Sequence, residues 1–214
     1  MTTLILDTAL HCAQAALFEN DVCLAQASQT GERGQAEVLL PVLEDVLKKA
    51  QRSWRDVQKI IVTVGPGVFT GIRSGIAAAR AVRMAQNVEL VGISTLQLLA
   101  ASAADKNKSV LAVIDAHKSE AYAQLFSSDL KPQGAPMLVR LEALPPVFKE
   151  AGQIVVYPAL FAQALAEYKN VQPVKALDLE KAVICAEAQP LDAVPLYIRA
   201  PDALPQQGAL LKRA

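Results

Sequence analysis

Two aspartates stand at matching places in the chain and could bind a metal-bound nucleotide. Asp7 follows the apolar run LIL and Asp115 follows the apolar run LAVI, so each ends a predicted strand. Carboxylates bind Mg²⁺ well together with phosphate oxygens. The alternative is structural, because an aspartate at a strand end also accepts hydrogen bonds from the N–H groups of the following turn. We favour the structural role for both.

The glycine-rich stretch GPGVFTGIRSG, residues 65–75, joins a predicted strand to a predicted helix. Such a turn binds phosphate when its backbone N–H groups and the helix dipole face an anion. The stretch lacks the Lys and Ser/Thr of a P-loop and the third glycine of the dinucleotide fingerprint, although Arg73 could contact a phosphate. The stronger interpretation is close packing, because Gly71, Gly75 and Ala79 recur every four residues on one helix face.

The histidines and cysteines predict neither a metal site nor a nucleophile. His11 and His117 occupy nearly equivalent places, but zinc would need a further ligand, so we expect surface residues and no bound metal. None of the three cysteines lies in a CxxC pair, which is typical of a reducing compartment. No residue has the neighbouring base that activates a nucleophile. The pattern therefore predicts no catalytic residue in this chain.

Composition and charge restrict the partners that the chain could bind alone. The 214 residues carry 21 basic and 21 acidic side chains, so no broad basic surface for nucleic acid is expected. No apolar run approaches the roughly 20 residues that span a bilayer. The first residues, MTTLILDT, lack the pattern of a secretory signal. We expect a cytoplasmic protein that contacts RNA, if at all, through a partner.

Hydrophobic periodicity predicts the elements that carry these residues. Apolar runs rich in β-branched residues predict strands at 60–64, 90–93 and 154–156 and at both apolar runs before the aspartates. Helical spacing of apolar residues predicts helices at 36–50, 70–86, 94–104, 141–151, 158–168 and 179–189. The proline-rich end, 190–205, is expected to wrap the surface with little regular structure.

The chain contains an internal repeat at an offset of 108 residues, the separation of Asp7 and Asp115. LDTALHCAQAALF, residues 6–18, aligns with IDAHKSEAYAQLF, residues 114–126. Abundant alanine and leucine could produce part of this match by chance, but the aspartates in register with the closing Leu-Phe favour duplication. Each copy is predicted as a strand, an aspartate turn and a second strand.

A duplication of this kind predicts an α/β fold with two lobes. We expect an N-terminal lobe at 1–105 and a C-terminal lobe at 106–214, with the tail packing back on the surface. Two lobes that each open with a hairpin sheet are typical of the actin, hexokinase and Hsp70 superfamily (the ASKHA fold). In that superfamily the two aspartate turns face each other across a nucleotide cleft.

The first two helices carry more apolar or small residues than one buried face requires. A helix normally spends about a third of its circumference on the core. Two neighbouring helices with spare apolar surface imply a partner, either a second copy or a homologue. The predicted interface residues are Leu39, Leu43, Leu47, Gly71, Ile72, Gly75, Ile76 and Ala79.

With these motifs in view, the sequence resembles the TsaB family, also called YeaZ. The resemblance rests on six segments that occur in family order: LDTA (6–9), LLP (39–41), GPGVFTGIRSG (65–75), GISTL (92–96), IDAHKSEAY (114–122) and PLYIR (195–199). It implies a non-catalytic subunit of the bacterial complex that adds threonylcarbamoyl to the adenosine at tRNA position 37. Two alternatives stay open, a glycoprotease- or ATPase-type hydrolase and a homodimeric scaffold for another client.

The resemblance also implies partners and a cofactor. The first two helices would form a four-helix bundle with a catalytic TsaD paralogue and stabilise it. A TsaE-type ATPase and, indirectly, tRNA complete the expected assembly, a homodimer is a further expectation, and no membrane is involved. No intrinsic cofactor is expected, while ATP or ADP with Mg²⁺ could bind at the complex interface. The residues that could contact this nucleotide are Asp7, Thr8, Arg73 and Asp115.

Three departures from the family pattern weaken any nucleotide chemistry in this chain alone. Gln35 stands where the family usually has a histidine before the first-helix motif, and His117 replaces the arginine of the second aspartate turn. Leu10 and Gln14 replace the usual Ser or Thr around the first turn. Each change removes a group that could hold phosphate or metal.

Overall fold

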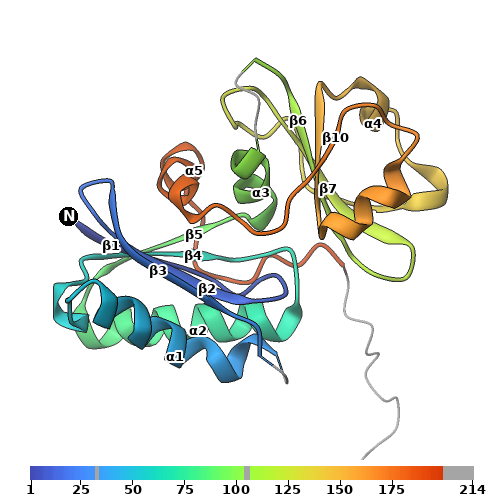
Figure 1. Ribbon diagram of the computed structural model, residues 1–214. Helices are drawn as coiled ribbons and strands as arrows, with labels where there is room; N and C mark the ends of the chain where they lie inside the picture. The colour runs from blue at the N-terminus through green and yellow to red at the C-terminus, as the bar shows by residue number, and fades with distance from the viewer. Residues whose placement is uncertain (32–33, 104–106, 200–214) are drawn as a thin grey trace, which may run out of the picture.

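The computed structural model describes residues 1–31, 34–103 and 107–199 and has two lobes, each built on a five-stranded sheet (Figure 1). The strands of the first sheet are β1 (Thr2–Asp7), β2 (Ala13–Glu19), β3 (Val22–Gln29), β4 (Lys59–Thr63) and β5 (Glu89–Ile93). Those of the second sheet are β6 (Val110–Asp115), β7 (Glu120–Phe126), β8 (Met137–Arg140), β9 (Gln153–Tyr157) and β10 (Val171–Pro173).

The two sheets have the same topology. In each, a central strand (β1 or β6) pairs antiparallel with the next strand and parallel with a later one (β4 or β9). Starting from the edge strand of the hairpin side, the orders are β3-β2-β1-β4-β5 and β8-β7-β6-β9-β10. The predicted α/β fold, with two lobes and a duplicated hairpin sheet, is therefore confirmed.

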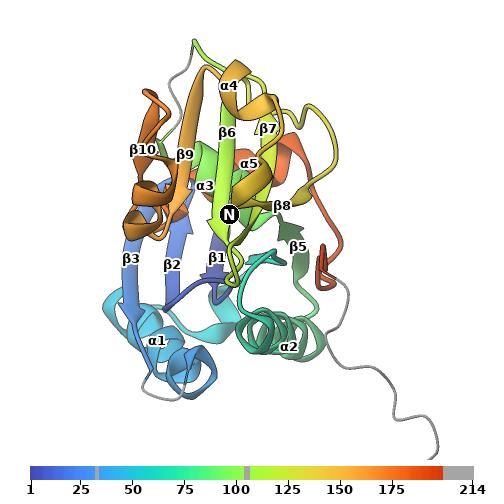
Figure 2. The same ribbon diagram turned by 90° about the vertical axis from the view of Figure 1, so that its right-hand side faces the viewer.

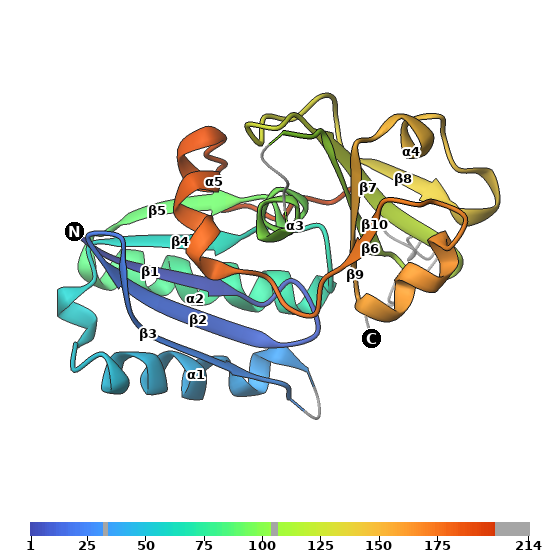
Figure 3. The same ribbon diagram turned by 45° about the horizontal axis from the view of Figure 1, so that its top comes forward.

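Two of the longer helices cover the first sheet, and two others each pack on the sheet of the opposite lobe. α1 (Gln35–Lys49) and α2 (Phe69–Gln86) lie side by side on the outer face of the first sheet (Figure 2). α3 (Thr95–Ala103) follows the first sheet in sequence but packs on β6, β7 and β9, while α5 (Ala182–Ala188) packs back on β4 and β5 (Figure 3). A boundary at residue 105 thus separates the two sheets, and both α3 and α5 pack across it. Of the described helices, none is long and apolar enough to cross a membrane.

The duplicated hairpins differ in register by one residue, because the turn after Asp7 is one residue longer than the turn after Asp115. Leu6 belongs to the apolar cluster under α1 and α2, whereas Ile114 belongs to the cluster between the lobes. Since side chains alternate between the faces of a strand, Asp7 shares the face of Ile5 and Asp115 shares the face of Val113, and these faces belong to different clusters. The two aligned aspartates therefore lie on non-equivalent faces of their sheets, although each accepts a hydrogen bond from the backbone N–H two residues further on.

Several predicted elements differ in the second lobe. The helix predicted at 141–151 is split, because Pro145 and Pro146 interrupt it, and the helix predicted at 158–168 is a 3₁₀ helix. The short strands β8 and β10 were not predicted. The short helices are η1 (Trp54–Asp56), η2 (Leu141–Ala143), α4 (Val147–Glu150), η3 (Ala159–Leu165) and η4 (Leu179–Lys181).

Candidate functional site

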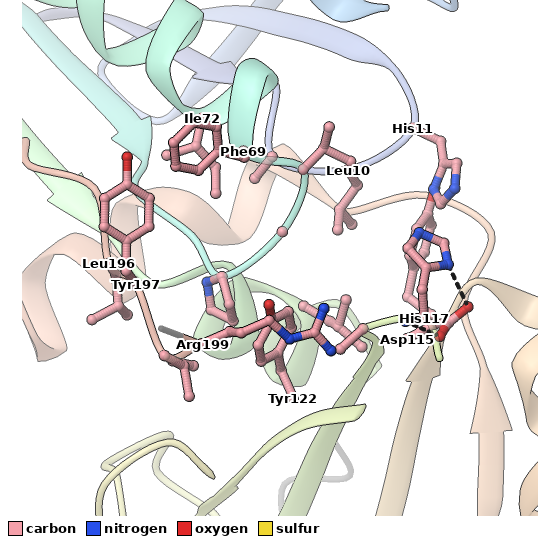
Figure 4. A pocket seen from close by; sticks show the side chains of 18 of the residues that line it. Leu10, His11, Phe69, Ile72, Asp115, His117, Tyr122, Leu196, Tyr197 and Arg199 are labelled. Carbon is pink, nitrogen blue, oxygen red and sulfur yellow. Dashed lines mark hydrogen bonds and ion pairs between the residues drawn. The ribbon is translucent and has the colours of Figure 1, made fainter. Parts of the chain in front are cut away.

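A cavity of about 600 Å³ lies between the two lobes, where the β1–β2 turn, the start of α2 and the β6–β7 turn meet (Figure 4). Its walls are mainly apolar and aromatic, and their side chains include Leu10, Phe69, Ile72, Ile114, Tyr122, Tyr157, Leu196, Tyr197 and Ile198. The charged and titratable side chains that line it are His11, Arg73, Asp115, His117 and Arg199. A cavity of this size and character could hold a small, largely apolar group.

Asp7 lies beneath this cavity and does not line it. Its side chain is fully buried, and its carboxylate accepts hydrogen bonds from Ala9 N at 3.0 Å, Thr63 Oγ1 at 2.5 Å and Gln14 Nε2 at 3.0 Å. Burial raises the pKa of the carboxyl above its ordinary value, and these hydrogen bonds lower the pKa by less. Asp7 therefore organises the first turn and the end of β4.

Thr8 and Arg73, the other predicted nucleotide contacts of the first lobe, already have partners within the chain. The Thr8 hydroxyl is buried and donates to the Gly71 carbonyl at 2.7 Å, which ties the β1 turn to α2. Arg73 is exposed at the rim, where its Nε donates to Tyr197 Oη at 2.8 Å. The Arg73 guanidinium also lies 3.7 Å from the centroid of the Phe69 ring, a cation–π contact.

Asp115 is the one predicted aspartate that faces the cavity. Its Oδ1 accepts a hydrogen bond from the His117 backbone N–H at 2.7 Å, and its Oδ2 lies 3.6 Å from His117 Nδ1. His117, Lys118 and Ser119 all have positive φ angles, so the β6–β7 turn is a tight left-handed turn. The His117 side chain is largely exposed.

Most of the predicted nucleotide contacts are already engaged by other groups of the chain. Mg²⁺ is held by oxygen ligands around the phosphates, and here one carboxylate faces the cavity while Asp7 and Thr8 are buried and hydrogen-bonded. Leu10 occupies the first turn with an apolar side chain. Across the described residues, no three His, Cys, Asp or Glu side chains converge as metal ligands. A nucleotide at the interface with a partner stays a prediction.

The eight residues predicted as a partner interface lie inside the chain. The side chains of Leu39, Leu43, Leu47, Ile72, Ile76 and Ala79 are all buried in the cluster between the outer helices and the first sheet. A Cβ atom at Gly71 would lie 2.0 Å from Thr8 O, and one at Gly75 would lie 2.3 Å from Thr8 Oγ1. The glycines do permit close packing, but against the β1 turn, so any partner surface must involve other residues of the two helices.

The outward side of α1 and α2 carries a different set of residues. Leu40 is 60 % exposed and Met84 is 87 % exposed, although both are large and apolar. We call the exposed residues around them the outer helix face, which comprises Leu40, Pro41 and Glu44 of α1 and Ala77, Arg80, Ala81 and Met84 of α2. Helical periodicity could have found these residues, because they fall between the positions that face the sheet.

Comparisons with known proteins identify the family. Residues 27–148, more than half of the chain, match the family model described as TsaD, tRNA N6-adenosine threonylcarbamoyltransferase. The chain belongs to the TsaD family. The sequence resemblance to TsaB and YeaZ is therefore confirmed at the level of the family and its TsaB-type relatives.

Similar proteins include a TsaB protein, an uncharacterized protein and a solved YeaZ structure. The chain is 33 % identical over 131 residues to an Escherichia coli protein named tRNA threonylcarbamoyladenosine biosynthesis protein TsaB, covering 60 % of this chain and 56 % of that protein. It is 30 % identical over 207 residues to an uncharacterized Mycobacterium tuberculosis protein, and the match covers 95 % of this chain and 94 % of that protein. The solved structure of YeaZ from Pseudomonas aeruginosa shares the fold, with a TM-score of 0.76, 22 % identity and coverage of 92 % and 99 %.

Two residues that line the cavity of this TsaD-family chain, Tyr197 and Arg199, and their neighbour Glu120 had no role assigned from the sequence. Glu120 and Arg199 form an ion pair across the lobes, and Tyr197 stacks on Phe69 with ring centroids 5.3 Å apart. The segment PLYIR is one of the family features, but the proline-rich composition of residues 190–205 predicts little regular structure there. The sequence therefore identifies the PLYIR motif but does not predict that its residues line the cavity.

Proposed function

We propose that the chain is a non-catalytic subunit of the machinery that makes threonylcarbamoyladenosine in tRNA. It binds a catalytic TsaD-type paralogue, while that partner performs the chemistry and contacts the tRNA. A TsaE-type ATPase acts in the same cytoplasmic assembly. Membership of the TsaD family supports this role, as does the name of the Escherichia coli relative.

In this proposal the catalytic paralogue binds to the outer helix face. Two large apolar side chains, Leu40 and Met84, are mostly exposed on neighbouring helices, and small residues such as Ala77 and Ala81 let another helix approach. Exposed apolar residues gathered on one face are typical of a protein interface. α2 contains arginines and no acidic residue, so the partner surface opposite α2 should carry acidic side chains.

The same face also accommodates a second copy of this chain. α1 contributes Glu44 to the outer helix face and α2 contributes Arg80, so two copies can pair acidic with basic side chains. In this proposal the homodimer and the complex with the paralogue exclude each other. ATP or ADP with Mg²⁺ binds at the interface with the paralogue, where the partner supplies the metal ligands that the cavity of this chain lacks.

Binding measurements with the TsaD-type protein from the same organism test the proposal. Leu40→Glu and Met84→Glu should each weaken the complex about tenfold or more, because each buries an unpaired carboxylate. Leu160→Glu is the matched control, since Leu160 is 78 % exposed on η3 of the second lobe. Unchanged affinity for both helix variants, or an equal loss for the control, would contradict this use of the outer helix face.

Activity and oligomeric state complete the test. The reconstituted mixture should modify tRNA only when this chain and the TsaD-type protein are both present, and the chain alone should neither modify tRNA nor hydrolyse ATP above background. Sedimentation should show that the paralogue displaces any homodimer. Robust ATP turnover by the isolated chain would instead favour a hydrolase.

A further inference from the structure

The chain after α5 crosses from one lobe to the other along the wall of the cavity. We call residues 190–199 the C-terminal strap. Leu191 pairs with Gly92 of β5 through two backbone hydrogen bonds, of 2.8 and 2.9 Å, and Leu196 N donates to Val64 O at 2.7 Å. The last residues of the strap then line the cavity (Figure 4).

The first part of the strap is held tightly against the first lobe. A Cβ atom at Gly92 would lie 2.6 Å from Asp192 O and 2.7 Å from Val64 Cγ1, so only glycine permits this approach. Backbone pairing and close packing both fix residues 191–196. The Leu196 N–H donates the last backbone hydrogen bond from the strap to the first lobe.

The end of the strap is held in a different way. Between described residues, no backbone hydrogen bond fixes Tyr197, Ile198 or Arg199 to either sheet. Tyr197 is 47 % exposed, and its side chain contacts Phe69 and Arg73 of the first lobe. The Arg199 guanidinium forms an ion pair with Glu120 of β7, in the second lobe.

We propose that residues 197–199 form a releasable latch that joins the two lobes across the cavity. Tyr197 fastens the latch to the first lobe and Arg199 fastens it to the second. When the latch opens, the adjacent Leu196 hydrogen bond opens with it more often, while the Leu191–Gly92 pairing keeps the start of the strap docked. Segments held by few, partly exposed side-chain contacts open locally at a lower free energy than paired strands. Release removes one wall of the cavity and one direct connection between the lobes, so it controls access to the apolar interior from that side.

The arginines around Glu120 provide a matched pair of variants. Arg199→Gln removes the ion pair that bridges the lobes. Arg140→Gln is the control, because Arg140 Nε lies 4.0 Å from Glu120 Oε1 but belongs to β8 of the same sheet. Tyr197→Phe keeps the ring on Phe69 and removes the hydrogen bond from Arg73. The three variants therefore separate the latch from the general effect of losing charge near Glu120.

Hydrogen exchange of individual amides in the full chain tests the latch. In Arg199→Gln the Leu196 amide, next to the latch, should exchange about tenfold faster or more, since a hydrogen bond to a charged group has been lost. The amides of β1 and β6 should keep their wild-type rates, and Arg140→Gln should leave Leu196 unchanged. An unchanged Leu196 rate in Arg199→Gln, or an equal increase in Arg140→Gln, overturns the proposal.

A second measurement follows the cavity itself. Arg199→Gln should bind the apolar dye 8-anilinonaphthalene-1-sulfonate more strongly than the wild type and Arg140→Gln, because the cavity wall opens more often. Equal dye binding by all three proteins overturns the role of the latch at the cavity. If Arg199→Gln raises amide exchange throughout both sheets, the variant is generally destabilised and Tyr197→Phe becomes the test. An unchanged Leu196 exchange rate in Tyr197→Phe then overturns the proposal.

Discussion

Replacing Gly75 by alanine tests the contact between α2 and the β1 turn. A Cβ atom at this position would lie 2.3 Å from Thr8 Oγ1 and 3.5 Å from Leu6 Cδ1. The Thr8 side chain is fully buried, and its hydroxyl donates to Gly71 O at 2.7 Å. It therefore cannot rotate away from the new methyl group without losing that hydrogen bond.

Two opposing effects determine how much Gly75→Ala changes the free energy of unfolding. Overpacking costs about 1–3 kcal/mol, and alanine in place of glycine inside a helix returns about 1 kcal/mol. Gly75→Ala should therefore lower the free energy of unfolding by up to about 2 kcal/mol. For a chain of this length, each kcal/mol corresponds to about 2–4 °C, so the Tm should fall by up to about 8 °C.

A double-mutant cycle with Thr8→Ala isolates the clash. Thr8→Ala alone should cost about 1 kcal/mol, the typical value of a lost hydrogen bond. In the double variant the added methyl meets no hydroxyl, so the coupling free energy should be stabilising by about 1–2 kcal/mol. The assay is urea unfolding followed by far-UV circular dichroism, with Ala81→Gly on the exposed side of α2 as the propensity control. Strictly additive effects of the two substitutions would refute the packing argument.

Two further predictions concern buried titratable groups. The folded pKa of Asp7 is raised above the unfolded value, so its contribution to stability is present below about pH 4 and is lost as pH rises through the folded pKa. Urea unfolding between pH 4 and 8 should show that Asp7→Asn removes this part of the pH dependence, and identical pH profiles would contradict it. Burial raises the pKa of the Cys185 thiol to about 12, so Ellman's reagent at pH 8 should modify Cys185 only after unfolding. Fast modification of Cys185 in the native chain would show that α5 opens readily.

The elements of the first lobe were predictable because their patterns are long and uninterrupted. α1, α2 and β5 begin within one residue of the predicted positions, since apolar residues recur at one period along each. In the second lobe, Pro145 and Pro146 interrupt a helical pattern, and β8 and β10 are too short to show a period. The pattern also continued through residues 159–165, where the backbone adopts a 3₁₀ helix instead.

For the candidate site, the sequence predicts which types of residue are important but not which residues they contact. The spacing of Gly71 and Gly75 indicated a close approach to α2, but a row of small residues does not say which segment approaches. The structure places the Thr8 turn there. Likewise, the excess of apolar residues on α1 indicated exposed apolar surface, and only the orientation of the helix on the sheet identifies Leu40 as the exposed one.

The two aspartates do not act as a pair, because their side chains have different surroundings. A metal held between lobes needs carboxylates from both turns that point into the same space. Because side chains alternate along a strand, Asp7 shares the face of Ile5 and Asp115 shares the face of Val113, and these two faces belong to different apolar clusters. Asp7 is held beneath the cavity by three hydrogen-bond donors, and its neighbour Thr8 ties the turn to α2. Of the two aspartates, Asp115 is the one that lines the cavity. Restoring a carboxylate opposite Asp115 would require a substitution at an exposed residue of the first turn, such as His11→Asp, and not a change at Asp7.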